Sequence, residues 1–310
     1  MNHFHTIKGL NCYEAAIYTC AQLSELEGYE IMLFDTMGFS LNWADGAFDL
    51  YQNPIYGDPR DYGAIENNFR DYLGFCLEKE EFDFHNYIEN ADEALISIAI
   101  DCYHAKWITR YYKKKHAYHI ITLQKSKETG EILCYDMNFE HVAQPYDVSL
   151  FGKDKIKDIF VCHFCEPKKK WDYESLWEKS RNHLRQTDYI TPLKEFRVLI
   201  DKNVNLKEFY GEEDALGIKL IGEMIPVIGG RKAYRIYLNK MSEITKNEKI
   251  AKSAERIDQV ITNWEKVFLI LIKCCFTEAD EKKKDILSLL DMIYEMEEDL
   301  RNQILRIEEL

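Results

Sequence analysis

The pattern of apolar residues changes at the run Pro167-Lys168-Lys169-Lys170, and this change restricts the folds that the chain can adopt. After it, long stretches show helical periodicity and contain only two prolines, Pro192 and Pro226. Before it, one amphipathic helix is mixed with aromatic-rich stretches and short β-branched segments, at 94–103, 116–124, 131–137 and 158–164. We therefore expect an α+β fold with two domains, residues 1–166 and a mainly helical domain at residues 167–310.

The helical part contains one clear amphipathic stripe and one expected break. The final stretch presents apolar residues at helical spacing, and its other face is rich in Glu and Asp; the stripe is Ile286, Leu290, Ile293, Met296, Leu300, Ile304 and Ile307. The run Pro226-Val227-Ile228-Gly229-Gly230 predicts a turn between helices. The longest apolar run, 267–276, contains Lys273 and is about half of the roughly 20 residues that cross a bilayer, so we expect a buried helix and no membrane partner.

Charge and cysteine content limit the compartment and the partners. The formal net charge of the 310 residues is −14, which opposes binding to a nucleic-acid backbone and suits a small cationic ligand better. The nine cysteines form an odd, irregularly spaced set, and the sequence shows no signal peptide. We expect reduced thiols in a cytoplasmic protein.

The first cysteine lies where a helix should begin. Asn11 is a favourable N-cap, Glu14 follows in capping-box position, and apolar residues recur at helical spacing until Gly28. Cys12 therefore falls in the first helical turn, where the partial positive charge of the helix N-terminus favours the reactive thiolate. The alternative interpretation is a small buried side chain that opens a core helix.

A histidine and a carboxylate that suit this thiol come from a predicted hairpin. On the strand 116–124, His119 shares a face with Ile121 and Leu123, so its ring should point inward. The polar run 127–130 predicts the turn, and a tight turn near Glu128 places Asp136 opposite His119. A turn centred one or two residues later would place Asn138 or Glu140 there instead.

These residue types are the parts of a catalytic triad. A carboxylate or amide beside the imidazole fixes its tautomer and orientation, and the second ring nitrogen can then exchange a proton with Cys12. A satisfied core histidine and a solvated acid at a strand end are the alternatives for His119 and Asp136 taken singly. The order Cys, His, Asp favours the catalytic interpretation.

Several short motifs resemble a known family. Asn11-Cys12-Tyr13-Glu14-Ala15-Ala16, Ala117-Tyr118-His119-Ile120-Ile121 and Tyr135-Asp136 look like the papain-like cysteine-protease fold of the bacteriocin-processing leader peptidases. The stretch 28–39 and the segment Ile100-Asp101-Cys102-Tyr103 resemble the butirosin-type acyltransferases, and the chain is also similar to the amide synthase of closthioamide assembly. The resemblance covers roughly residues 5–165 and implies a papain-like catalytic domain.

The resemblance implies acyl transfer in natural-product biosynthesis. The donor would be an acyl or peptidyl carrier protein that holds the acyl group as a thioester on its 4′-phosphopantetheine, with no other cofactor, and the acceptor would be a small amine or diamine. Carried over residue by residue, Cys12 is the nucleophile, His119 the base and acid, and Asp136 the orienting residue.

One departure from the peptidase pattern bears on the reaction. Papain-like peptidases place a glutamine shortly before the nucleophile as an oxyanion donor, whereas residues 5–10 here contain none. Losing one such donor costs on the order of 100- to 1,000-fold. We expect the backbone N–H of Cys12, with Asn11 and Thr6 nearby, to provide a weaker site that an activated thioester tolerates.

The remaining candidate residues concern the two substrates. Asp35, Asp45 and Asp101 could collect a cationic amine, although loop or strand-end acids are the plainer interpretation. Arg110, Lys113, Lys114 and Lys115 run into the histidine strand and could dock an acidic carrier protein, although solvated loop lysines are the plainer interpretation.

Two other functions remain open, and no metal site is expected. The first is a cysteine hydrolase, either leader-peptidase-like or a thioesterase, and the second is a non-catalytic papain-like binding module. The motif Cys162-His163-Phe164-Cys165 contains zinc-ligand types but lacks a second half, and alternation along a strand accounts for it.

Overall fold

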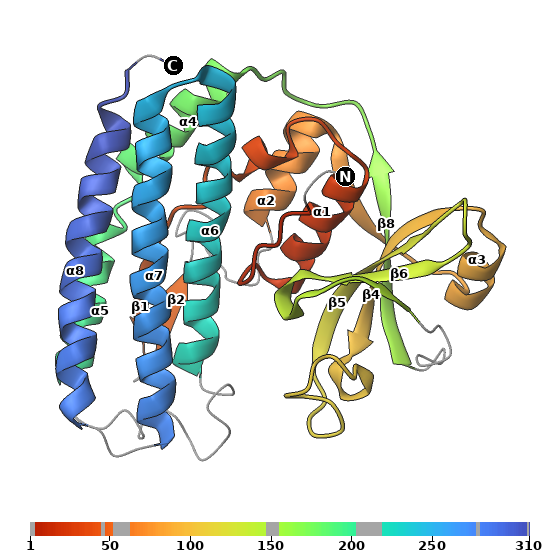
Figure 1. The fold of residues 1–310 in the computed structure, drawn as a ribbon, viewed down its shortest axis with the longest axis horizontal. Coiled ribbons are helices and arrows are strands. Elements are labelled where there is room, and N and C mark those ends of the chain that lie inside the picture. The colour runs from red at the N-terminus through yellow and green to blue at the C-terminus, as the bar shows by residue number, and fades with distance from the viewer. Residues whose placement is uncertain are drawn as a thin grey trace. The chain divides into compact units, whose positions relative to one another are not determined.

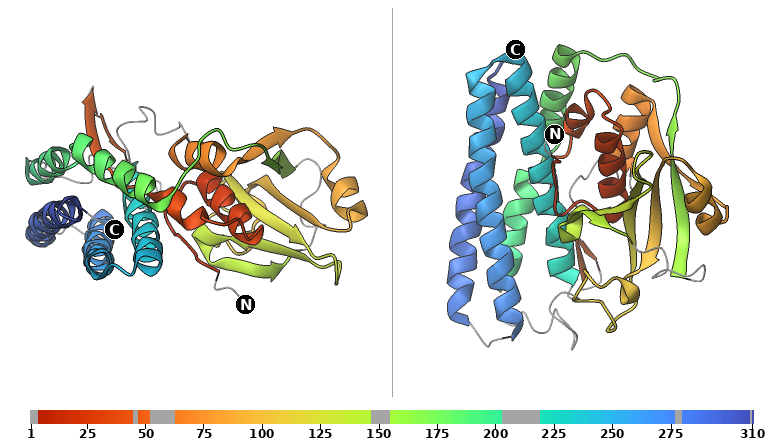
Figure 2. Two further views of the ribbon diagram at one scale, coloured as in Figure 1. Left: turned by 90° about the horizontal axis from the view of Figure 1, so that it is seen from above. Right: turned by 45° about the vertical axis from the view of Figure 1, so that its right-hand side comes forward.

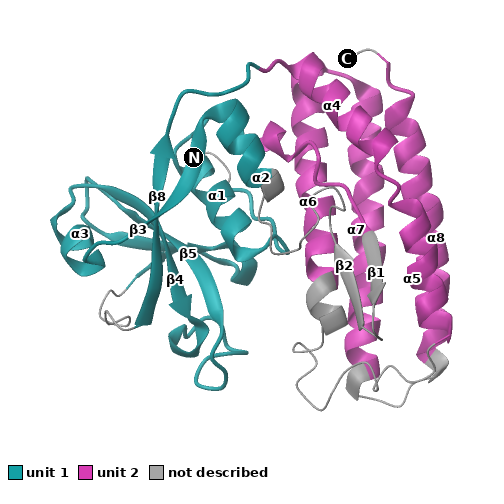
Figure 3. Cartoon of the chain, turned by 180° about the vertical axis from the view of Figure 1, so that it is seen from behind, with its two compact units in different colours: residues 1–29, 65–170 teal, residues 30–64, 171–310 magenta. Residues whose placement is uncertain are grey.

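The computed structural model describes residues 4–44, 47–51, 63–146, 155–202, 219–276, 280–308 and 310. It is a mixed helix and sheet structure, so the expected α+β class is confirmed. The chain forms two compact units, one from residues 1–29 and 65–170 and the other from residues 30–64 and 171–310 (Figure 3). The expected domains were residues 1–166 and 167–310. The observed division differs from them because residues 30–64 join the second unit.

The first unit is built on a six-stranded antiparallel sheet. Its strand order is β3-β8-β4-β5-β6-β7 (Figure 1). The strands are β3 (Phe75–Glu80), β4 (Ala94–Asp101), β5 (Tyr118–Lys125), β6 (Ile132–Asp136), β7 (His141–Pro145) and β8 (Ile156–Phe164). The four expected strands are confirmed as β4, β5, β6 and β8, while β3 and β7 were not predicted.

Helices lie on both faces of this sheet. On one face, α1 (Cys12–Leu23) places Cys20 against Ser97 of β4 and Thr122 of β5. On the other face, α3 (Phe84–Asn90) buries Phe84 and Ile88 in a core with the alternate residues of the same strands, among them Ile96, Ile98, Ile100, Ile121 and Leu123. The β-branched strands are therefore buried on both sides, which explains their continuous apolar character.

Short helical segments connect these elements. They are η1 (Tyr29–Leu33), α2 (Gly63–Asn68), the π-helical turn η3 (Phe69–Leu73), η4 (Cys102–His104) and η5 (Met137–Phe139). Gly74 ends η3 with φ +64°, and a Cβ there would lie 2.0 Å from the carbonyl oxygen of Cys165. Glycine is required at that position because the backbone of β8 passes so close.

The hairpin β5–β6 is confirmed, but its register differs from the first expectation. Ser126 and Glu131 close the turn, and Thr122 pairs with Tyr135. This register is shifted by two residues from the one that sets His119 opposite Asp136, because the turn is centred one residue later than expected. The paired ladder ends at Thr122 and Tyr135, and η5 follows directly after Asp136.

The second unit consists mainly of long helices. They are α4 (Tyr173–Gln186), α5 (Ile190–Lys202), α6 (Lys219–Thr245), α7 (Glu248–Phe276) and α8 (Asp280–Leu305), with the two-stranded sheet β1 (Ser40–Ala44) and β2 (Ala47–Tyr51). In the views of Figures 1 and 2, α6, α7 and α8 run side by side along most of their length. Every residue of the expected apolar stripe from Ile286 to Ile307 is buried.

A buried network explains why the segment after residue 29 belongs to the helical unit. The Phe39 ring packs on Phe196 and Trp264, with ring centroids 5.9 and 5.8 Å away. The guanidinium of Arg231 donates to the carbonyl oxygen of Gly38 at 2.7 Å, and the His183 ring contacts the carbonyl oxygen of Met37 at 2.6 Å. These long-range contacts are not visible in a residue pattern.

The expected turn at 226–230 is wrong, because α6 continues through Pro226, Gly229 and Gly230. Val227, Ala233 and Tyr234 are fully buried, and this packing offsets the low helix propensity of proline and glycine. Among the described residues, no helix is long and apolar enough to span a membrane.

Candidate active site

Cys12 is the first residue of α1, and the cap that holds it there is the expected one. The side-chain oxygen of Asn11 accepts the backbone N–H of Glu14 at 2.8 Å. Cys12 is a free thiol of intermediate exposure. Because the first N–H groups of a helix lack intrahelical acceptors, the thiol lies beside unpaired backbone dipoles that favour a negative charge.

The segment that leads into Cys12 is fastened by Asn138 of η5. The Asn138 side chain accepts the N–H of Gly9 and donates to the carbonyl oxygen of Leu10, both at 3.2 Å. Gly9 has φ +105°, a backbone conformation that residues with a Cβ rarely adopt, so glycine suits this sharp bend. The approach to the nucleophile is thereby tied to the chain that follows Asp136.

His119 is buried at the start of β5, beside Asp136. Its Nε2 lies 3.0 Å from Oδ2 of Asp136. The contact is an ion pair whose geometry falls short of a hydrogen bond, since Nε2 has no hydrogen-bond partner among the described residues. The Phe139 ring meets the imidazole edge to face at 5.2 Å. Catalytic hydrogen bonds are often poorly aligned before substrate binds.

The charge of His119 follows from these neighbours. Burial lowers the pKa of His119, but hydrogen bonding and charge interactions with Asp136 and Cys12 outweigh it and raise the pKa from 6.5 to about 9. The ring is therefore protonated at pH 7. An imidazolium beside a thiol at a helix N-terminus is the arrangement that stabilises a thiolate.

Asp136 is buried between two donors. Its Oδ2 accepts the indole N–H of Trp107 at 2.9 Å in addition to the His119 contact. The other two residues that the sequence left open lie elsewhere. Asn138 binds Gly9 and Leu10, while Glu140 is exposed and pairs with Lys8. Asp136 reaches His119 because the ladder stops before it and η5 turns the chain.

The two residues expected near an oxyanion have other environments. The carboxamide oxygen of Asn11 is engaged as the helix cap. Thr6 is exposed, and no described contact joins it to Cys12. The backbone N–H groups of the first turn are the donors that the described geometry offers to an oxyanion at Cys12.

Two of the three expected amine-binding acids lie in described parts of the chain. Asp101 holds His116 at 2.6 Å and accepts the N–H of Tyr103; burial raises its pKa, but these bonds together lower it. Asp35 is buried in the second unit. Asp45 lies outside the described residues.

The basic residues expected to dock a carrier lie in one ordered loop, 105–116. Lys113, Lys114 and Lys115 are exposed, and Arg110 stacks on the Tyr111 ring at 4.4 Å. The exposed Lys106 adds a fifth cation, and residues 106–115 contain no acid. Backbone bonds fix the loop, including one from Lys113 N–H to the carbonyl oxygen of Tyr103 at 3.0 Å. We name this the basic loop.

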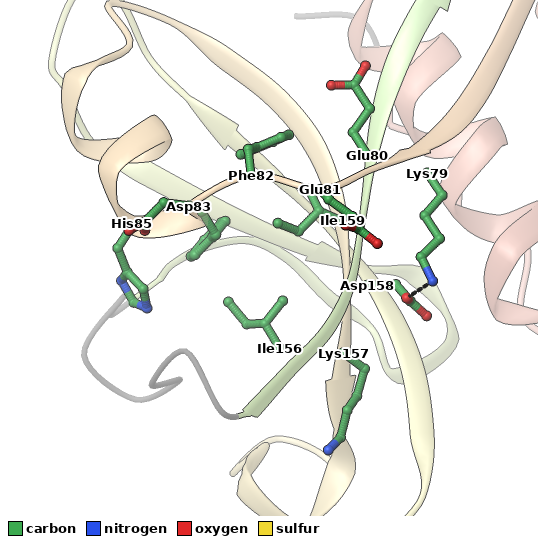
Figure 4. A pocket seen from close by; sticks show the side chains of 11 residues that line it. Lys79, Glu80, Glu81, Phe82, Asp83, His85, Ile156, Lys157, Asp158 and Ile159 are labelled. Atoms are coloured by element: carbon green, nitrogen blue, oxygen red, sulfur yellow. Dashed lines mark ion pairs between the residues drawn. The ribbon is translucent and has the colours of Figure 1, made fainter.

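A separate pocket of about 410 Å³ lies between the end of β3, the start of α3 and the start of β8 (Figure 4). Its floor includes Phe82 and Ile159, and an ion pair between Lys79 and Asp158 crosses its rim. None of the predicted site residues lines this pocket. Its rim mixes both signs of charge, so its lining does not select one class of ligand.

The Cys162-His163-Phe164-Cys165 motif occupies the last three residues of β8 and the residue that follows it. His163 Nε2 lies 2.8 Å from a carboxylate oxygen of Glu80, and hydrogen bonding to the buried Cys20 raises the pKa of Cys162. The described residues contain no group of three or more His, Cys, Asp and Glu side chains arranged to hold a metal ion.

Trp107 is the site residue that the sequence analysis missed. It lies in the basic loop, and no motif links a loop tryptophan to an acid on a later strand. The available signal was weak: a tryptophan carries one N–H donor and usually finds an acceptor when partly buried.

The comparisons with known proteins add no relative. No protein-family model matches the chain, and no curated protein matches it significantly.

Proposed function

We propose that this chain is a papain-like cysteine acyltransferase that moves an acyl group from a carrier-protein thioester to a small amine. The observation that carries the proposal is a buried His119 that is paired with Asp136 at 3.0 Å and whose pKa is also raised by Cys12, the first residue of a helix. A core histidine without a catalytic role would not need both a buried anion and a thiol among the groups that raise its pKa.

The first half-reaction forms an acyl-enzyme. The Cys12 thiolate attacks the thioester carbonyl carbon, and the tetrahedral intermediate expels the carrier's phosphopantetheine sulfur. The His119 imidazolium gives its proton to that leaving thiolate, so the carrier thiol departs neutral. Asp136 keeps the ring oriented throughout.

The second half-reaction forms the amide. The amine nitrogen attacks the Cys12 thioester, and the now neutral His119 removes a proton from it. Collapse of the intermediate expels the Cys12 thiolate, which restores the thiolate and imidazolium pair. Only the unprotonated amine attacks, and an amine with a pKa near 10.4 is neutral in roughly one molecule in 2,500 at pH 7, so the acceptor reacts from a small neutral fraction.

The weak oxyanion site favours a thioester substrate over a peptide. The glutamine of the peptidase pattern is absent, and the described donors at Cys12 are backbone N–H groups. A thioester carbonyl is more reactive than an amide and needs less stabilisation. The cysteine hydrolase is the second candidate, because the same triad would transfer the acyl group to water.

The basic loop supports the proposal that the acyl donor is held by an acidic carrier protein. Five cations within ten residues contrast with a net charge of −14 for the chain. The loop also touches the triad through Trp107, so a carrier docked on it would deliver its pantetheine arm near His119.

The test is incubation of an acylated carrier protein with the enzyme, with and without a panel of mono- and diamines. We expect amide product with amine, little free acid without it, and no turnover by Cys12→Ala. Equal amounts of free acid in both reactions would identify a hydrolase. Binding of the acyl carrier without turnover of either kind would identify a binding module.

A further inference from the structure

One oxygen of Asp136 accepts a hydrogen bond from Trp107 and forms an ion pair with His119. Oδ2 lies 2.9 Å from Nε1 of Trp107 and 3.0 Å from Nε2 of His119. Asp136 is 2% exposed, so water does not replace either donor. A buried carboxylate with one donor fewer would be free to rotate away from the imidazole or to take up a proton.

The indole is itself held rigidly. Its ring stacks on His141 at a centroid distance of 4.4 Å and an angle of 11°, and His141 is the partner of Asp136 across the β6–β7 pair. Burial lowers the pKa of His141 despite the nearby Asp136, so the stacked ring is neutral at pH 7. The N–H of Ile108 binds the carbonyl oxygen of Ala105 at 3.0 Å and fixes the backbone around Trp107.

We propose that Trp107 is a positioning residue of the triad, which holds the Asp136 carboxylate toward His119 and connects the basic loop to the catalytic groups. The inference deepens the proposed function and rests on it. Trp107 does not touch the reacting atoms; it acts through Asp136.

The titratable groups around this contact are few. Cys12 on α1 and Asp136 at the end of β6 act on His119, while Asp136 also acts on Cys102, Cys134 and His141. Burial, with Asp136 contributing, raises the pKa of Cys102 to about 12 and that of Cys134 well above 9. Both thiols are therefore neutral near pH 7, so a change in Cys12 reactivity there does not come from their ionisation.

The experiment is the pH dependence of Cys12 alkylation by iodoacetamide, followed by intact mass with peptide mapping. Trp107→Phe removes the N–H donor and keeps an aromatic ring. We expect alkylation about tenfold slower than wild type at pH 7 and equal to it above pH 9.5, where the thiol ionises without help. This loss is far smaller than the ~10⁴-fold effect of disabling a triad acid.

Two further variants keep the result interpretable. Trp171→Phe, outside the network, should leave the profile unchanged. Benzothienylalanine at position 107 replaces only the N–H by sulfur and should reproduce the Trp107→Phe profile even if that variant folds poorly. A rate that falls by the same factor at every pH, or does not fall, would overturn the positioning role.

The alkylation assay is independent of the acyl donor. If Trp107→Phe slows Cys12 alkylation at pH 7 as expected but the wild type does not turn over acylated carrier, the proposed reaction is wrong and the positioning role stands. Normal turnover with an unchanged Trp107→Phe profile would sink the positioning role alone.

Discussion

At the scale of single residues, the protonation of His119 depends on its two anionic or ionisable neighbours. Burial alone would favour a neutral ring, while Asp136 and Cys12 raise the pKa of His119 to about 9. Asn138 has a different task, because it binds the backbone of Gly9 and Leu10. Asp136 therefore sets the charge of His119, while Asn138, two residues later, holds the backbone that leads to Cys12.

Asp136→Asn should change the pH dependence of turnover, since the buried anion is lost. The wild-type rate should fall as pH rises through about 9, where the leaving thiol loses its proton donor. In Asp136→Asn we expect this alkaline decline in rate to move toward pH 6.5. We also expect turnover at pH 7 to fall by up to ~10⁴-fold. Steady-state rates between pH 5 and 10 measure both.

Asn138→Ala is the matched control. It removes a side chain from the same turn without removing a charge near His119. We expect a lower rate with the alkaline limb still near 9. If the two variants shifted the limb equally, Asp136 would not be the group that sets the charge of His119.

The sequence predicted the residue types of the site better than their contacts. Cys12 and His119 stand out because a capped helix and an inward strand position are local features. The choice among Asp136, Asn138 and Glu140 depends on where a hairpin ladder ends, which one residue of turn length decides. Trp107 depends on a loop path that no periodicity encodes.

At the scale of secondary-structure elements, the start of α1 depends on one side chain. Asn11→Ala removes the acceptor for the Glu14 N–H and should lower the free energy of unfolding by about 1 kcal/mol, within the range of about 0.5–2 kcal/mol for caps. Asn11→Ser keeps an acceptor oxygen and should remain close to wild type. Urea unfolding measures both, and equal stability of the two variants would refute the capping role.

The basic loop gives a prediction about the donor. Changing Lys113, Lys114 and Lys115 to Glu should raise KM for an acylated carrier at least tenfold and weaken its salt dependence, because the charge complementarity is reversed. KM for a small thioester without a carrier should not change. The matched control reverses the run Lys282-Lys283-Lys284 of α8. An effect of equal size there would indicate general attraction rather than docking.

The element boundaries show where local patterns suffice. The β-branched segments gave β4, β5, β6 and β8. In contrast, β3 ends in the charged run Glu78-Lys79-Glu80, which does not resemble a strand, but β8 pairs with it throughout. In α6, burial against the other helices overrides Pro226 and two glycines.

At the scale of the whole molecule, the chain leaves the first unit at residue 29 and returns to it at residue 65. In the second unit, Arg231 and Glu297 form a fully buried bidentate ion pair at 2.9 and 2.8 Å. Trp264 also donates to Glu297 at 2.8 Å. Arg231 further binds Gly38, so one guanidinium joins the helices to the segment from residue 30.

Arg231→Met should destabilise the second unit strongly, because it leaves the Glu297 carboxylate buried without its cation. We expect a loss of about 3–5 kcal/mol in the free energy of unfolding. The double variant Arg231→Met with Glu297→Leu removes the stranded charge and should recover part of that loss. Urea unfolding monitored by tryptophan fluorescence tests this, and a double variant less stable than the single one would contradict it.

The composition of the units could not be read from the sequence alone. The change of pattern near Pro167 lies close to residue 171, where the chain enters the helical unit for the second time. It did not reveal that residues 30–64 join that part, because the reason lies in contacts of Phe39, Gly38 and Met37 with helices more than 140 residues later.

The most direct test of the catalytic account is intact-mass analysis of the protein after brief exposure to an acylated carrier in the absence of amine. The account predicts a mass increase equal to one acyl group, located on Cys12 by peptide mapping, absent in Cys12→Ala and discharged by amine to give an amide. An unmodified Cys12 in a protein that still converts the acyl carrier would contradict it.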